Sequence, residues 1–111
     1  MMLSEESHMK EYNKLVRDKI PDIMRSNGAQ PIVERIHPDS MQLHLNNKLR
    51  EEVEEYLTDG NRVEELVDIL TVIFAILESK GVSLYDFMRL YSKKLESRGG
   101  FRDGLYLLRE L

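Results

Sequence analysis

Apolar residues recur three and four positions apart over three long segments, and that spacing places them on one face of an α-helix. The first segment begins at Asp39 or Ser40, either of which can cap a helix, and it continues to about Thr58. Its apolar positions are Leu45, Leu49, Val53, Tyr56 and Leu57. The pattern predicts one amphipathic helix over this segment.

The second segment is apolar on most of its circumference. It begins after Asn61, a predicted cap with Glu64 as its capping-box partner, and it runs to about Lys80, where Gly81 stops it. A helix with this pattern is either central in a bundle or part of an interface. We expect it to be the central helix. The short connection at residues 59–61 favours an antiparallel hairpin with the preceding helix.

The third segment is predicted to begin at Ser83, with Asp86 in its first turn. Its inner face is formed by Leu84, Phe87, Met88, Tyr91 and Leu95. A shorter helix is predicted near the N-terminus, with Pro21 at its first position, because the residue before a proline disfavours helical geometry. Asn27-Gly28 supplies the stop signal of that helix.

Two further segments have strand-like character. Residues 31–36 read as a short strand, and the apolar tail at residues 105–108 could pair with it as a small two-stranded β ribbon. The predicted fold is therefore an all-α bundle of about four helices, with this ribbon, completed by oligomerisation. Residues 12–111 form its single domain, and residues 1–11 are an N-terminal extension or tag remnant, because Ser7-His8-Met9 resembles a cloning scar.

Length and composition exclude several classes of partner and of metal site. A chain of 111 residues argues for one domain with a modest core, so we expect a homodimer or a dimer of dimers. The net charge of −4 argues against a nucleic-acid polymer or an anionic membrane as partner. The absence of cysteine excludes thiolate metal sites and is compatible with a reducing compartment. No stretch reaches the roughly 18 apolar residues of a membrane span, so we expect a cytoplasmic protein.

A carboxylate interrupts the most apolar helix. Asp68 follows Leu66 and Val67 and precedes a long apolar run, and an ionised group beside a core is costly unless it is paired or bound to a metal. Glu65 lies one helical turn earlier, and the acids of the preceding helix are Glu51, Glu52 and Glu55. If the two helices form a hairpin, these carboxylates can converge on a hard cation such as Mg²⁺.

Simpler interpretations remain open for these charges. Acid-rich helical stretches are usually solvated faces, and Asp68 could be satisfied by a lysine or by a partner subunit. Two basic segments could contact phosphate, one with Lys14, Arg17 and Lys19 beside Asn13, and one with Lys94 and Arg98 before Gly99-Gly100. Cations at the end of a helix also complement its dipole, and Gly-Gly can simply terminate it.

The acidic pattern, with Glu51-Glu52-x-x-Glu55 followed by Glu65-x-x-Asp68, resembles the metal-binding signature of the MazG-like all-α nucleoside triphosphate pyrophosphohydrolases. Tyr12-Asn13-Lys14-Leu15-Val16-Arg17-Asp18-Lys19-Ile20-Pro21 is similar to the opening of a small branch often labelled phosphoribosyl-ATP pyrophosphohydrolase-like. Arg98-Gly99-Gly100-Phe101 fits the end of the same branch. The resemblance covers residues 12–111.

This resemblance implies an oligomeric helical enzyme that uses Mg²⁺, with Mn²⁺ as an alternative, to cleave a nucleoside triphosphate between its α and β phosphates. The implied metal ligands are Glu52, Glu55, Glu65 and Asp68. Glu51 and Glu52 are the implied catalytic residues. The implied substrate contacts are Asn13, Lys14, Arg17, Lys19, Lys94 and Arg98.

We expect a house-cleaning hydrolase of the nucleotide pool. Phosphoribosyl-ATP hydrolysis in histidine biosynthesis is the alternative enzyme, and a non-catalytic nucleotide-binding oligomer is the alternative of another class. We also expect Arg17 to hold phosphate without affecting the metal.

Overall fold

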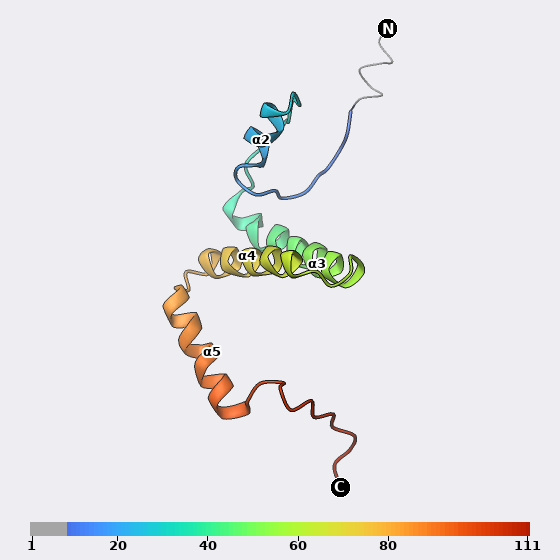
Figure 1. Cartoon of the computed structure of the whole chain (residues 1–111). Coiled ribbons are helices and arrows are strands. Elements are labelled where there is room, and N and C mark those ends of the chain that lie inside the picture. The colour runs from blue at the N-terminus through green and yellow to red at the C-terminus, as the bar shows by residue number, and fades with distance from the viewer. Residues whose placement is uncertain (1–8) are drawn as a thin grey trace.

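Two long helices lie side by side at the centre of the computed structural model, which describes residues 9–111. They are α3 (Met41–Thr58) and α4 (Val63–Ser79), and the chain reverses between them (Figure 1). Gly60 has a φ of 74° in the connection, a left-handed conformation that glycine adopts without strain. The predicted antiparallel hairpin is confirmed, and its facing sides determine which carboxylates meet.

The start of α4 differs from the prediction. Arg62 is the residue at its N-cap, without a side-chain cap, so the predicted capping box of Asn61 and Glu64 does not form. Asn61 has a φ of 56°, and its side-chain amide donates to the Tyr56 carbonyl at 3.3 Å. Asn61 therefore closes the end of α3 instead of opening α4, which a residue tolerant of left-handed geometry can do.

The last helix, α5 (Leu84–Arg98), begins as predicted. The backbone N–H of Asp86 donates to Oγ of Ser83 at 3.1 Å. The helix ends at Gly99, which has a φ of 78°. Figure 1 shows α5 leaving the hairpin from the end of α4 and running away from it. Only the start of α5 is thus close to the hairpin.

The N-terminal part contains the short helix α2 (Ile20–Ser26) and a single 3-10 turn, η1 (Pro38–Ser40), directly before α3. Asn27 follows the end of α2, as predicted, but the helix begins at Ile20, so Pro21 is its second residue and not its first. Of the predicted extension, residues 9–11 have no regular structure, and residues 1–8 lie outside the described residues. All four α-helices of the predicted all-α fold are therefore present.

The predicted ribbon is absent. Within the described residues, neither 31–36 nor 105–108 is a strand, and the two segments lie on opposite sides of the hairpin (Figure 1). Ile32 is 99% exposed, so its apolar side chain packs against nothing that could hold the segment in register. An isolated two-stranded ribbon is marginal in water, and local β-propensity does not make one without a packing surface.

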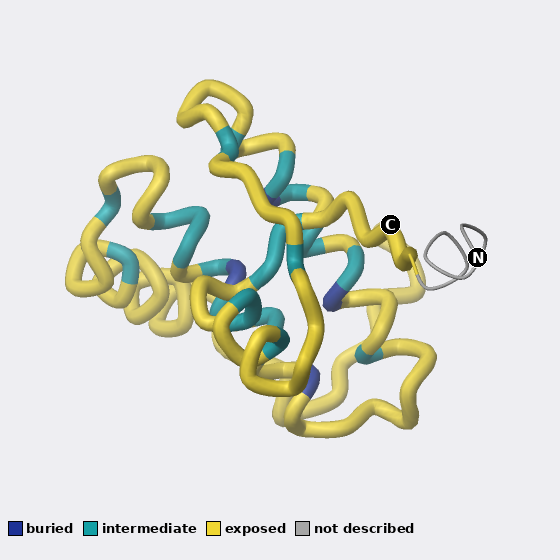
Figure 2. The backbone as a smooth tube through the Cα atoms, turned by 90° about the horizontal axis from the view of Figure 1, so that it is seen from above, coloured by how far each residue is buried: buried dark blue, intermediate teal, exposed yellow. Residues whose placement is uncertain are grey.

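The chain buries little apolar surface. Leu45 and Val72 are the only buried apolar residues of the described part, and most of the backbone in Figure 2 is exposed. The chain exposes 10634 Å², whereas a compact monomer of 13.1 kDa exposes roughly 6,400 Å². The excess is several times the ~800 Å² per partner that a standard protein interface covers. The single chain therefore leaves much apolar surface uncovered.

The exposed apolar residues form two stripes at helical spacing. The stripe of α4 consists of Val63, Leu66, Val67, Leu70 and Phe74. The stripe of α5 consists of Leu84, Met88, Tyr91 and Leu95. Most of the predicted inner face of α5 is therefore uncovered in a single chain. Within residues 9–111, no helix combines the length and the apolar character that crossing a bilayer requires.

Candidate metal centre

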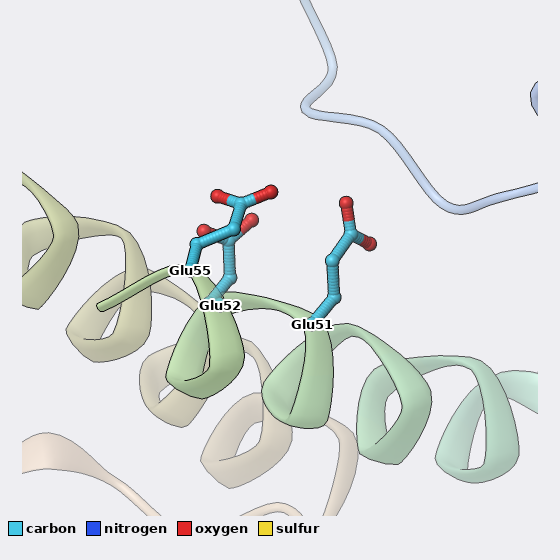
Figure 3. Close-up of side chains that lie close together, drawn as sticks. All are labelled: Glu51, Glu52 and Glu55. Carbon is cyan, nitrogen blue, oxygen red and sulfur yellow. The ribbon is translucent and has the colours of Figure 1, made fainter. Parts of the chain in front are cut away.

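Three carboxylates project from one side of α3. Figure 3 shows the side chains of Glu52 and Glu55 close together and that of Glu51 farther along the helix on the same side. Each of the three offers an oxygen, and these oxygens lie within 4.8 Å of one another. Their positions follow from the helix, because residues three and four apart are neighbours on its surface.

The hairpin adds two carboxylates from α4. Oxygens of Glu52, Glu65 and Asp68 also lie within 4.8 Å of one another. Glu52 belongs to both groups, so the two groups adjoin at Glu52, between the two helices. We call these five residues, Glu51, Glu52, Glu55, Glu65 and Asp68, the acidic centre.

Burial makes this arrangement costly. Glu52 is 6% exposed and Glu65 is 7% exposed, although both are acidic. Oε2 of Glu52 is buried without a hydrogen-bond partner in the described structure. Buried polar atoms almost always have a partner, and an unpaired one costs ~1–3 kcal/mol, more if charged. A solvated helix face does not account for this oxygen.

Basic side chains neutralise part of the charge. Nζ of Lys48 lies 3.3 Å from Glu51 and 3.4 Å from Glu52, and Arg62 lies 3.4 Å from Glu65. Partial burial acts to raise the pKa of Glu51, but hydrogen bonds from Lys14 and Lys48 outweigh it and hold that pKa below its ordinary value. Glu51 is thus the ionised acid of the centre that has the most cationic support.

Glu55 has the opposite environment. Loss of water around its carboxylate raises the pKa of Glu55, and the charges of Glu52, Glu51 and Glu65 raise it further. Among the described residues, no ion pair joins Glu55 to a lysine or arginine. A divalent cation would relieve the repulsion around it, and hard cations prefer carboxylate oxygens. The donor set therefore fits Mg²⁺ or a similar ion.

The predicted basic segment reaches the acidic centre. Nζ of Lys14 lies 3.1 Å from Glu51, and this contact raises the pKa of Lys14. The guanidinium of Arg17 donates to Asp68 at 2.5 Å and to Oγ1 of Thr71 at 3.2 Å. Arg17 thus contacts a predicted metal ligand, which argues against the expectation that it acts independently of the metal.

The other predicted substrate contacts are not gathered here. Lys19 is exposed at the start of α2, and Asn13 has a φ of 48° in the loop. Lys94 and Arg98 lie in the last part of α5, and Figure 1 shows that part directed away from the hairpin. Within residues 9–111, no hydrogen bond or ion pair connects these four to the acidic centre. A single chain does not bring Lys94 and Arg98 to it.

The sequence prediction missed two members of this site. Thr71 holds Arg17, and it lies three residues after Asp68 on the same side of α4. Arg62 supports Glu65 from three residues earlier. The spacing of three could have identified both, because each lies one helical turn from a predicted ligand.

No family model, no curated protein and no solved structure matches this chain.

Proposed function

We propose that the chain is a Mg²⁺-dependent nucleoside triphosphate pyrophosphohydrolase, which cleaves the α–β phosphoanhydride to give a nucleoside monophosphate and pyrophosphate. The observation that carries this proposal is the buried, unpartnered oxygen of Glu52 at the junction of two groups of carboxylates. House-cleaning of the nucleotide pool is the proposed purpose. The proposed reaction type is that of the MazG-like family, which the acidic pattern and residues 12–21 resemble.

The metal ligands in this proposal are Glu52, Glu55, Glu65 and Asp68. A bound Mg²⁺ would neutralise phosphate charge and lower the pKa of a water molecule, and Mn²⁺ accepts the same oxygen ligands. Divalent ions of this kind are often held by a few carboxylates together with the phosphates of the substrate. In the described structure Glu55 has no ion pair, and Oε2 of Glu52 has no hydrogen-bond partner, so oxygens remain that such an ion could bind.

The chain's own residues supply the proton chemistry and the phosphate contacts. Glu51 is ionised, which lets it accept a proton from an attacking water, although the hydrogen bonds from Lys14 and Lys48 lower its basicity. Glu52 is the second candidate for this role. Lys14 and Arg17 carry the charge-assisted donors closest to the acidic centre, and such donors bind phosphate oxygens strongly.

Assembly is a further part of the proposal. We propose a homodimer or a dimer of dimers in which the apolar stripes of α4 and α5 are covered by another copy of the chain. Lys94 and Arg98 lie on the helix that carries one of these stripes. In such an assembly Lys94 and Arg98 can contact the phosphates bound by a neighbouring subunit.

Two alternatives share the observed site. Phosphoribosyl-ATP hydrolysis in histidine biosynthesis cleaves the same type of bond, so it differs only in the nucleotide accepted. A non-catalytic nucleotide-binding oligomer would keep the fold without turnover. The number of carboxylates favours an enzyme, because binding alone does not require five acids in two adjoining groups.

Pyrophosphate release from a panel of nucleotides, measured with Mg²⁺, tests the proposal. The panel includes standard and modified nucleoside triphosphates and phosphoribosyl-ATP. Glu55→Gln should abolish release, and Glu54→Gln is the matched control, because Glu54 is exposed on the same helix without an ion pair in the described structure. Release that survives Glu55→Gln unchanged, or no release from any nucleotide, would refute the enzyme.

A further inference from the structure

The guanidinium of Arg17 binds a carboxylate that is also a proposed metal ligand. Its guanidinium donates to Oδ1 of Asp68, and Asp68 is one of the three residues whose oxygens converge with those of Glu52 and Glu65. The contact joins residues 51 positions apart in the chain. It therefore links the basic loop to the acidic centre through one carboxylate.

Thr71 gives Arg17 a second attachment. Oγ1 of Thr71 accepts from the guanidinium at 3.2 Å and donates to the Val67 carbonyl at 2.8 Å. The hydroxyl is held in place by its own helix. A guanidinium that leaves Asp68 can thus remain beside α4 by keeping this neutral contact.

Lys14 and Arg17 differ in whether the acid that each contacts would keep another cationic partner if the contact broke. Glu51 is shared by Lys14 and Lys48, so the departure of Lys14 leaves Glu51 paired. Arg17 is the cation that contacts Asp68 in the described structure, so its departure frees that carboxylate completely. A divalent ion concentrates two charges at one point, whereas the charge of a guanidinium is single and delocalised, so the ion is the stronger ligand for a carboxylate group.

We propose that Arg17 is a displaceable counter-ion: it pairs with Asp68 in the metal-free protein, and a divalent cation displaces it and frees its guanidinium for the phosphates of the substrate. This inference rests on the metal centre of the proposed function. Its consequence is an order of binding, in which the cation enters first and the phosphate chain follows. The metal and the phosphate site are thereby coupled through Asp68.

Mn²⁺ binding to the full chain, without nucleotide, tests the exchange by calorimetry. Arg17→Ala removes the competitor, so the variant should bind Mn²⁺ about two- to fivefold more tightly than the wild type, the range that an exposed ion pair supports. Arg25→Ala is the matched control. Arg25 pairs with Asp22 on α2 at 2.9 Å, away from the acidic centre, and its removal should leave Mn²⁺ affinity unchanged.

If Arg17→Ala does not fold, the exchange can still be tested on the wild type by NMR. The side-chain N–H signal of Arg17 in nitrogen–hydrogen NMR spectra, assigned with Arg17→Lys, should lose its ion-paired shift when Mg²⁺ is added. A signal that does not respond to saturating Mg²⁺ overturns the exchange, as does a folded Arg17→Ala that binds Mn²⁺ equally or more weakly. If the wild type binds no Mn²⁺, the metal centre itself is refuted. That result contradicts the proposed function and is distinct from a failure of the exchange.

Discussion

Glu52 of α3 and Glu65 of α4 face each other between the two helices, and each has less than a tenth of its surface exposed. Two buried like charges oppose folding unless a cation lies between them. Lys48 and Arg62 offset part of this charge, but Oε2 of Glu52 stays buried without a partner in the described structure, which costs the hairpin stability. Functional sites commonly retain such local conflicts because the chemistry requires them.

The first prediction concerns this conflict. In the presence of a chelator, Glu52→Gln should raise the free energy of unfolding by roughly 1 kcal/mol, because it removes one buried charge and provides an amide donor for Glu65. Urea denaturation measures the change. With Mg²⁺ present the order should reverse, since the wild type gains stability from the ion and the variant loses a ligand. A variant less stable than the wild type in chelator would contradict the interpretation of Glu52.

The second prediction concerns Asp68. Asp68→Asn keeps the shape of the side chain and removes its charge, so turnover should be abolished while α3 and α4 still form. Mg²⁺ should raise the melting temperature of the wild type by ligand linkage and that of the variant much less. Circular dichroism monitors both the helices and the melting. Near-wild-type pyrophosphate release from Asp68→Asn would mean that Asp68 is not a metal ligand.

The third prediction concerns pH. The pKa of Glu55 is raised above its ordinary value of 4.5, so protonation begins at a higher pH than for a free glutamate. A proton and a cation compete for the same carboxylate, hence Mg²⁺ affinity should fall as the pH falls through that raised pKa. Titrations of Mg²⁺ at several pH values measure this. Glu55→Gln should bind more weakly and lose part of the dependence, and an affinity that is flat with pH would exclude Glu55 as a ligand.

The fourth prediction concerns substrate. Each charge-assisted phosphate contact is worth on the order of 1.5–3 kcal/mol, so Arg17→Ala should raise KM for a nucleoside triphosphate by roughly tenfold or more at saturating Mg²⁺. Steady-state pyrophosphate release measures it, and Arg25→Ala is again the control. If Arg17 only stabilises the fold, the variant will melt earlier and its KM will stay near that of the wild type.

The fifth prediction concerns assembly. Light scattering at micromolar concentration should show a dimer or a tetramer, because the stripe of α4 leaves Leu70 and Phe74 exposed in a single chain. Leu70→Glu places a charge in the middle of that stripe and should shift the protein to smaller species. A wild type that is monomeric under these conditions would rule out the assembly. It would also remove Lys94 and Arg98 from the phosphate site.

Much of the acidic centre follows from local rules. The spacing of Glu52 to Glu55 and of Glu65 to Asp68 places each pair on one side of a helix, and the short connection then brings the two sides together. The contact between Arg17 and Asp68 could not be obtained in this way. It depends on the path of a loop without regular structure, and no periodicity encodes that path.

The errors have physical causes as well. Residues 31–36 have the composition of a strand, but a strand needs a neighbour, and the chain offers none beside it. Asn61 has the composition of a cap, but the reversal after α3 needs a left-handed residue at that position, and Asn61 supplies it. In both cases the requirement of the surrounding chain outweighs the local preference.

All the carboxylates of the acidic centre come from residues 51–68, and the turn between their helices is short. Closing so short a loop costs little chain entropy, and contacts between near neighbours in sequence form fast during folding. The five acids can thus meet before the rest of the chain is arranged. Mutual repulsion in that early hairpin would slow its formation, and a divalent ion bound as we propose would offset that repulsion.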